Sequence, residues 1–309
     1  MIPLIVDTDP GVDDAMALLV AMGSPEARLD AVTTVYGNVE LAVTTGNAQR
    51  LLALGGRAGV PLGAGADRPL VYQQPSRAGA WHGEDGLGGL AGTLPPPAAP
   101  PDPRGAIGLL ADLLRDGDAP ATLVAIGPLT NVALLFAVHP ELAGRIGRLV
   151  VMGGALDGGN ITPAAEFNVW SDPEAARRVL VEERVPTTLV PLDLTERTLV
   201  DAAWLDALAG SGERGATVAG VLAHYRGRWR QSTGQDGVVL HDAVAMLEAV
   251  VPGTLRTTPM ALEVVCDQGP ARGSVIAAHG DAAAAGRPVD VALDADLDAV
   301  RAEILRRVR

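Results

Sequence analysis

Several residue types are absent or scarce in this 309-residue sequence. It contains no lysine, so all 24 basic residues are arginine, which excludes Schiff-base chemistry and a phosphate-binding P-loop lysine. Cys266 is the single cysteine, so neither an intramolecular disulfide nor a multi-cysteine zinc site can form. Basic residues are outnumbered by 37 acidic ones, and the net charge of −13 argues against binding to a nucleic-acid backbone.

Long hydrophobic runs are missing as well. No stretch of 18 or more apolar residues occurs, and the sequence begins with the strand-like run 1–6 without a basic segment before it. We therefore expect no membrane span, no signal peptide and a cytoplasmic location. With 48% hydrophobic and 20% charged residues, the chain is long enough to bury a substantial core.

Short β-branched runs alternate with amphipathic stretches, as in parallel strands joined by helical crossovers. The sequence predicts an α/β fold, a single domain over residues 1–309 whose mainly parallel central sheet is flanked by helices. Near the C-terminus the spacing changes, and extra hairpin-like or edge strands are expected before a last helix. The predicted strands are 3–6, 29–35, 121–126, 148–152, 187–191, 260–265, 274–278 and 288–292, and the predicted helices are 13–22, 39–54, 105–115, 131–138, 173–182 and 297–307.

An aspartate cluster follows the first predicted strand. The segment DTDPGVDDA places Asp7, Asp9, Asp13 and Asp14 within eight residues. Ligands bind at the carboxyl ends of strands in open parallel sheets, and carboxylates gathered there are suitable ligands for Ca²⁺ or Mg²⁺. Alternatively, Asp9 caps the next helix while Asp13 and Asp14 favour its positive end. Capping explains one or two of the four acids, so we favour a metal site.

Two polar clusters lie far away in the sequence. AEFNVW carries Glu166 and Asn168, a few residues after Asn160, and LHDAVA opens a helix with His241 and Asp242. Each cluster places short polar side chains at the end of an apolar segment. A histidine beside an aspartate at a helix start is a candidate catalytic residue, since histidine changes its charge near neutral pH.

Aromatic residues are few, but most of them stand in or beside motifs. The four Trp, three Tyr and two Phe residues include Trp81, Phe167, Trp170, Tyr225 and Trp229 in such places. These positions suggest surfaces on which a ring could stack, although Phe167 and Trp170 could equally fill the core. His82 lies in the glycine-rich segment WHGEDGLGG, which favours a mobile lid over a core position.

Together these motifs resemble one known family. DTDPGVDDAMAL, the GN pair at residues 37–38, HGEDGLGG, IGPLTNVA, AEFNVWSDPEAA and HDAVA occur in the order found in nucleoside hydrolases, particularly the inosine-uridine-preferring members. The resemblance implies a Rossmann-like nucleoside hydrolase fold. It further implies hydrolysis of the N-glycosidic bond of ribonucleosides such as inosine or uridine, using a water held by Ca²⁺. Ca²⁺ would be the cofactor, a ribonucleoside the small-molecule partner, and the assembly a homodimer or homotetramer.

The resemblance also implies a role for each matching residue. Asp9, Asp14, Asp242 and the backbone carbonyl of Ile126 would bind Ca²⁺, with Asp9 also acting as base on the water, and His241 would protonate the leaving base. The residues expected to contact the substrate are Asp13 and Asn168 at the 2′-hydroxyl, Asn160 and Glu166 at the 5′-hydroxyl, Asn38 beside the sugar, and Trp81, His82, Phe167, Tyr225 and Trp229.

Further implications concern supporting groups and loops. Asp7 would orient the metal ligands from behind, and loops near 76–90 and 226–240 would be mobile. Many relatives have proline where this chain has Ala243, and an aliphatic residue where it has Trp81, so the chain departs from the family pattern in the base pocket and not at the ribose site.

Two other functions fit parts of the pattern. Asp7 and Asp9 form the Asp-x-Asp that opens phosphatases with an aspartyl-phosphate intermediate, and hydrolysis of a phosphomonoester would favour this reading. The chain has no lysine to serve such a phosphatase, and the other clusters would be left without a role. A non-catalytic Ca²⁺-dependent nucleoside-binding protein would leave nucleosides intact and would not need His241.

Overall fold

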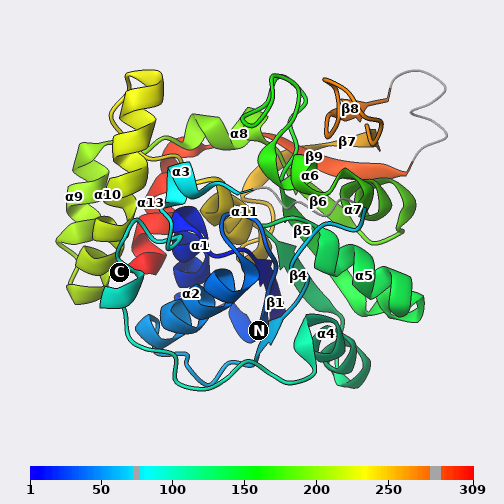
Figure 1. Cartoon of the computed structure of the whole chain (residues 1–309), viewed down its shortest axis with the longest axis horizontal. Helices are drawn as coiled ribbons and strands as arrows, with labels where there is room; N and C mark the ends of the chain where they lie inside the picture. The colour runs from blue at the N-terminus through cyan, green and yellow to red at the C-terminus, as the bar shows by residue number, and fades with distance from the viewer. Residues whose placement is uncertain (72–76, 279–286) are drawn as a thin grey trace.

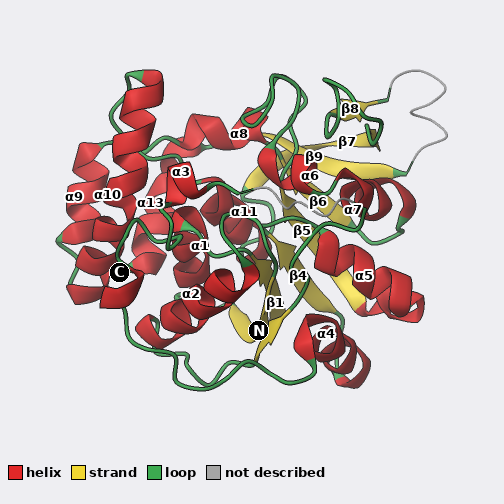
Figure 2. Ribbon diagram, in the orientation of Figure 1, coloured by secondary structure: helices red, strands yellow, loops and turns green. Residues whose placement is uncertain are grey.

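The computed structural model describes residues 1–71, 77–278 and 287–309. A central sheet contains nine described strands in the order β3-β2-β1-β4-β5-β6-β9-β7-β8 (Figures 1 and 2). Neighbouring strands from β3 to β9 in this order pair in parallel, whereas β7 pairs antiparallel with both β9 and β8. The strands are β1 Ile2–Thr8, β2 Ala27–Thr34, β3 Leu62–Ala64, β4 Ala121–Ala125, β5 Ile146–Met152, β6 Thr187–Val190, β7 Leu255–Val264, β8 Val275–Ala277 and β9 Pro288–Ala295.

Helices cover both faces of the sheet (Figure 2). The described α-helices are α1 Val12–Met22, α2 Leu41–Leu54, α3 Gly79–His82, α4 Gly105–Asp116, α5 Thr130–Val138, α6 Phe167–Ser171, α7 Pro173–Arg177, α8 Leu192–Thr195, α9 Ala202–Ala209, α10 Glu213–Thr233, α11 His241–Val250 and α13 Leu297–Val308. Within the described ranges, no helix is both long enough and apolar enough to cross a membrane.

The sheet separates two hydrophobic cores. In β1, Leu4 and Val6 belong to the core shared with α1 and α11, whereas Ile5 faces the core shared with α4 and α5. Successive side chains of a strand point to opposite faces, so a strand covered on both sides has to be apolar throughout. This explains why the inner strands read as continuous hydrophobic runs and could be predicted as parallel.

The mainly parallel sheet is therefore confirmed, while some elements differ from the prediction. β3 was not predicted, because three residues carry little periodic signal. β7 begins at Leu255 instead of residue 260, since its first half is exposed and polar. β9 lies inside the sheet between β6 and β7, and so is neither an edge strand nor half of a hairpin.

The segment 226–240 also differs from its predicted loop. Residues 226–233 continue helix α10, which ends at Gly234 with the left-handed φ of 76°. Aromatic packing of Trp229 against Tyr225, one helical turn away, outweighs the polar and glycine-rich composition of this segment. Only residues 234–240 connect α10 to α11 as a loop.

Candidate active site

Buried carboxylates gather at the carboxyl end of the sheet. The turn between β1 and α1 carries Asp9, the first turn of α1 carries Asp13 and Asp14, and the first turn of α11 carries Asp242. The helices α1 and α11 pack side by side, so their N-termini lie together. Carboxylate oxygens of Asp13, Asp14 and Asp242 all lie within 4.8 Å of one another.

Asn38 and the β1–α1 turn hold two of these carboxylates in place. Asp14 accepts hydrogen bonds from the Thr8 hydroxyl (2.5 Å), from the Gly11 N–H (2.8 Å) and from the Asn38 side chain (3.1 Å). The Asn38 N–H donates to Asp9 Oδ2 at 2.7 Å. Asp9 accepts no N–H from α1, so the alternative in which it caps the helix is wrong. Asn38 therefore supports both carboxylates directly, while its predicted contact with the sugar stays a prediction.

The carboxylate cluster has the properties of a cation site. Asp9 Oδ1 and Asp13 Oδ1 are buried and have no hydrogen-bond partner among the described residues. Burial, followed by repulsion from Asp14, raises the pKa of Asp9 well above its ordinary value. Burial and then Asp13, Asp14 and Asp9 do the same for the pKa of Asp242. An all-oxygen donor set with unsatisfied, mutually repelling carboxylates fits a hard divalent cation.

We expect the metal-free protein to lose stability as the pH rises from 6 to 8. Burial raises the pKa of Asp7 and Glu166 to about 7 and the pKa of Asp9 and of Asp242 well above its ordinary value, whereas the carboxyl groups of an unfolded chain have values near 4. A raised pKa contributes stability that is complete below the unfolded value and is lost as the pH passes the folded value. Thermal unfolding in EDTA at both pH values measures the loss.

The two buried histidines of the site affect the stability of the protein in the opposite direction and at lower pH. The pKa values of His82 and His241 are lowered to about 4, so they cost stability mainly as the pH falls below 6.5. Adding a divalent cation at pH 8 should restore the unfolding midpoint. An EDTA-treated protein that is equally stable at both pH values would show that the carboxylates are not strained.

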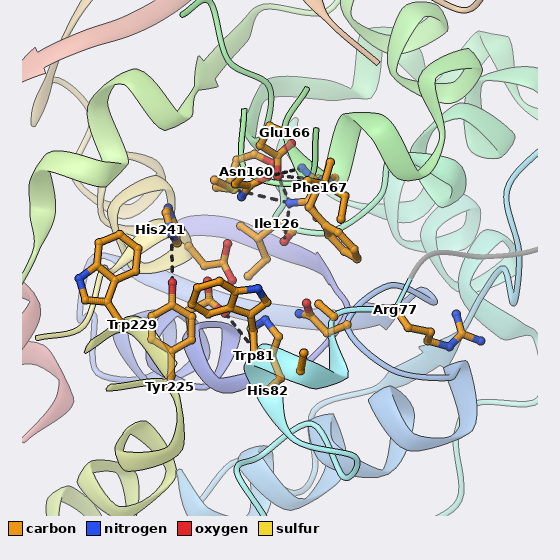
Figure 3. Close-up of a pocket in the computed structure, with 18 of the residues that line it drawn as sticks. Arg77, Trp81, His82, Ile126, Asn160, Glu166, Phe167, Tyr225, Trp229 and His241 are labelled. Atoms are coloured by element: carbon orange, nitrogen blue, oxygen red, sulfur yellow. Dashed lines mark hydrogen bonds and ion pairs between the residues drawn. The ribbon is translucent and has the colours of Figure 1, made fainter. Parts of the chain in front are cut away.

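A cavity of about 270 Å³ opens above the cluster (Figure 3). The structure brings all ten predicted substrate-contact residues to its wall, together with Ile126, His241 and Asp242. Asp9 and Asp14 lie behind this wall. The predicted contacts are Asp13, Asn38, Trp81, His82, Asn160, Glu166, Phe167, Asn168, Tyr225 and Trp229. Segments that are distant in the sequence, from residue 13 to residue 242, thus form one site, while the role of each residue stays a prediction.

One half of the cavity is built from amides and a carboxylate that are fixed by backbone groups. Glu166 caps α6 and accepts the N–H groups of Asn168 (2.8 Å), Val169 (3.1 Å) and Gly154 (2.8 Å). The Asn168 side chain donates to the carbonyl of Ile126 at 3.3 Å. Glu166 thus has a structural function in addition to its predicted contact with the 5′-hydroxyl.

The other half of the cavity is aromatic. The ring of Tyr225 lies 5.7 Å from that of Trp81 and 6.5 Å from that of Trp229, the latter nearly parallel at 11°. Tyr225 Oη is 3.4 Å from His241 Nε2, and Thr195 Oγ1 is 2.8 Å from His241 Nδ1. Burial, followed by His82, lowers the pKa of His241, so its imidazole is neutral at pH 7 in the metal-free protein.

His82 is buried, unlike the residue of a poorly packed lid. Its Nδ1 accepts the N–H of Val12 at 3.0 Å, and the residue lines the cavity. Nearby, Asp85 accepts three backbone N–H groups of the glycine-rich loop, at Leu87, Gly89 and Ala91. The loop therefore has more internal contacts than its composition predicts. Its mobility, like that of 226–240, stays a prediction, and Ser76 lies outside the described residues.

Asp7 does not contact the carboxylate cluster as predicted. Its Oδ1 accepts the Thr33 hydroxyl at 2.6 Å and the Asn131 amide at 2.8 Å, and it makes no hydrogen bond to Asp9 or Asp14. Asn131 also donates to the carbonyl of Thr34. Asp7 therefore ties β1 to β2 and α5, because its side chain points to the opposite face from that of its neighbours in the strand.

Some residues of the site carried no sequence signal. Thr195 supports His241 from α8, and Glu196 and Arg77 line the cavity, yet none of the three belongs to a motif on which the sequence analysis relied. Trp170, by contrast, does not line the cavity, and it packs against Gly273. Isolated side chains such as Thr195 become part of a site only through tertiary packing.

Residues 4–302 match the family model described as inosine-uridine preferring nucleoside hydrolase. The chain belongs to this nucleoside hydrolase family. Its fold and its reaction class, nucleoside hydrolysis, agree with the prediction. Membership of the family favours this reaction over the phosphatase and over the non-catalytic binding protein.

Curated relatives include two pyrimidine-specific ribonucleoside hydrolases named RihA. That of Salmonella agona (strain SL483) is 38% identical over 258 residues, covering 83% of this chain and 82% of the relative. That of Enterobacter sp. (strain 638) is 40% identical, covering 83% and 81%.

Solved nucleoside hydrolase structures share the whole fold. The plant nucleoside hydrolase PpNRh1 superposes with a TM-score of 0.93 at 31% identity, covering 99% of this chain and 98% of that one. The purine-preferring ribonucleoside hydrolase from Gardnerella vaginalis gives the same TM-score and coverage at 28% identity. Both superpositions cover nearly the whole chain, so the fold is that of solved nucleoside hydrolases.

Proposed function

We propose that the protein hydrolyses the N-glycosidic bond of ribonucleosides, including uridine, to free base and ribose with Ca²⁺ in the carboxylate cluster. The observation that carries this proposal is the pair of buried carboxylate oxygens, Asp9 Oδ1 and Asp13 Oδ1, that accept no hydrogen bond from the described residues, at a cavity with polar and aromatic walls. The pyrimidine-specific relatives make uridine the first substrate to test.

The residues that would hold Ca²⁺ are Asp9, Asp14, Asp242 and the carbonyl of Ile126. All four offer oxygen, which Ca²⁺ prefers, and Asn168 fixes the Ile126 carbonyl through its 3.3 Å hydrogen bond. When bound, the ion would supply positive charge that makes a water more acidic and attracts the ribose hydroxyls. Asp13 lies within the tightest carboxylate group, so its free Oδ1 could serve the ion or the 2′-hydroxyl.

Asp9 is suited to accept the proton of the attacking water. Its Oδ2 is held by the Asn38 N–H, which leaves Oδ1 free. Its raised pKa makes it a stronger base than an ordinary carboxylate. Three or four buried carboxylates also stabilise the positive charge that develops on the ribose ring as the bond to the base breaks.

His241 would assist departure of the base. Thr195 fixes its Nδ1, and Nε2 faces Tyr225 and the cavity. A purine could take a proton from Nε2 at N7, whereas a pyrimidine has no such atom and would gain less. Trp81, Tyr225 and Trp229 would stack on the base.

The protein should release uracil from uridine. Its kcat/KM for 2′-deoxyuridine should be lower by a factor of about 10² or more, because the deoxy compound leaves buried polar groups unpaired. Chromatography of the free base measures both rates. EDTA should abolish uridine hydrolysis, and added Ca²⁺ should restore it. Equal kcat/KM for the two nucleosides would contradict the ribose contacts. Hydrolysis of p-nitrophenyl phosphate in place of uridine would contradict the whole proposal.

The cytoplasmic location and a homodimeric or homotetrameric assembly also belong to this proposal. They rest on the family membership and on the lack of a membrane-crossing helix in the described part of the chain. Cell fractionation and size-exclusion chromatography with light scattering would test them.

A further inference from the structure

The buried side chain of Asn47, on α2, contacts two segments that are far apart in the sequence. Its amide nitrogen donates to the carbonyl of Pro10 at 3.1 Å and to the carbonyl of Asp85 at 2.9 Å. Pro10 belongs to the acidic turn, residues 9–14, which leads from β1 into α1. Asp85 belongs to the glycine loop, residues 82–91. A single amide group thus uses both of its N–H donors to hold the acidic turn and the glycine loop together.

The acidic turn and the glycine loop also touch each other directly. His82 Nδ1 accepts the N–H of Val12 at 3.0 Å. A Cβ atom on Gly11 would lie 2.6 Å from His82 Nδ1, and a Cβ atom on Gly86 would lie 2.8 Å from Asn47 Nδ2. Both approaches are too close for a side chain, so each requires glycine. The two segments are therefore packed tightly at two separate points.

Hydrogen bonds within the glycine loop hold it together as one unit. The Asp85 carboxylate accepts three backbone N–H groups of the loop at distances between 2.8 and 3.0 Å. The Gly88 N–H donates to the carbonyl of His82 at 2.8 Å. Trp81 precedes the loop, and both Trp81 and His82 line the cavity (Figure 3). A displacement at Asp85 is therefore transmitted to two residues of the cavity wall.

We propose that Asn47 is a positioning residue that couples cation binding at the acidic turn to the position of the glycine loop. Among the described residues, Asn47 is not one of those that line the cavity, so its effect passes through the two segments that it joins. The coupling rests on the proposed function, because it requires a cation in the carboxylate cluster.

The direction of the coupling follows from the charges of the acidic turn. Carboxylate oxygens of Asp13, Asp14 and Asp242 lie within 4.8 Å of one another, so they repel each other until a cation binds. A cation removes this repulsion and stabilises the turn in the position that Asn47 and His82 contact. The glycine loop is then held against the turn. By linkage, a loop held in this position strengthens cation binding by the same factor.

Hydrogen–deuterium exchange of peptides from the glycine loop, with and without Ca²⁺, tests the coupling. In the unmodified protein, saturating Ca²⁺ should slow exchange in the loop about tenfold, because the cation lowers the population of the open loop. In Asn47→Ala, Ca²⁺ should slow the exchange less than about twofold, and the Kd for Ca²⁺ from calorimetry should rise about fivefold or more.

Asn131→Ala is the matched control for Asn47→Ala. Asn131 is also a buried amide, but its hydrogen bonds reach Asp7, Thr34 and Ala66 and neither of the two coupled segments. Its loss should lower the unfolding midpoint while Ca²⁺ still slows exchange in the glycine loop. A general loss of stability is thereby separated from a loss of coupling.

A second variant disturbs the same contact from the side of the glycine loop. Gly86→Ala would press a methyl group against Asn47, whereas a Cβ atom on Gly89 would have no neighbour within 4 Å. Gly86 and Gly89 both have a left-handed φ, of 75° and 85°, so alanine is strained equally at the two positions. Gly86→Ala should therefore raise the Kd for Ca²⁺, and the Ca²⁺ concentration for half-maximal uridine hydrolysis, more than Gly89→Ala does.

The outcomes separate the coupling from the proposed function. If Ca²⁺ binds and uridine is hydrolysed, while Asn47→Ala keeps the Kd and the slowed exchange of the unmodified protein, the inference is wrong and the proposed function stands. If the unmodified protein binds no Ca²⁺, the proposed function fails and the coupling fails with it. Exchange in EDTA then decides the positioning role alone, since the glycine loop should exchange faster in Asn47→Ala than in Asn131→Ala, and equal rates would refute that role.

Discussion

Asp242→Ala and Asp9→Asn should each lower kcat/KM for uridine by about 10³-fold or more, since each removes a group proposed to bind the cation and Asp9 is also the proposed base. The fold should survive. Both side chains lie at the ends of elements and outside the hydrophobic cores, and their buried charges repel the other carboxylates. Uracil release, circular dichroism and thermal unfolding in EDTA together measure the two effects.

The stability measurement separates a lost metal site from a damaged fold. In EDTA, removal of one repelling carboxylate should leave the unfolding midpoint unchanged or raise it. With Ca²⁺ present, the unmodified protein should gain more stability than either variant. Asp118→Asn, in an exposed turn before β4, is the control and should behave like the unmodified protein. Near-normal activity of Asp9→Asn in EDTA would refute the proposed mechanism.

Gly37→Ala should lower activity by about 10²-fold without changing a single polar group of the site, because small displacements of a catalytic group are costly. A Cβ atom at residue 37 would lie 2.0 Å from Asp9 Oδ2 and 2.8 Å from its carboxyl carbon. The Asp9 carboxylate would have to move away from the Asn38 N–H that holds it. Steady-state kinetics with uridine measure the loss.

Gly46→Ala provides the comparison for Gly37→Ala. Gly46 lies within α2, and a Cβ atom there would have no neighbour within 4 Å, so alanine should stabilise the helix slightly and leave activity unchanged. A Gly37→Ala variant as active as the Gly46→Ala variant would show that the position of Asp9 is not critical.

The fold could be predicted largely from local patterns. The inner strands are apolar on both faces, and this produces uninterrupted hydrophobic runs such as that of β1. The position of β9 could not be predicted in this way. Its place between β6 and β7 depends on the path of the whole chain and leaves no local signal.

The site could be predicted where its residues form clusters in the sequence. Asp13 and the pairs at residues 166–168 and 241–242 line one cavity, and Asp14 lies close to Asp13 and Asp242. Partnerships between isolated residues could not be foreseen. Asn38 bonds to Asp9 and Asp14, while Asp7 bonds away from them, because the direction of each side chain follows from its place on the strand or turn.

The interior position of β9 has a consequence for synthesis of the chain. Strand β6 ends at residue 190, yet its second neighbour is β9, which begins at residue 288. While the ribosome is still adding the residues between them, β6 remains an open sheet edge, and open edges are sites of aggregation. Strands β1 to β6 can pair early, whereas β7 and β8 can join the sheet only after residues 288–295 of β9 have left the exit tunnel. Chaperone dependence and truncation sensitivity should therefore concentrate in the C-terminal third of the chain.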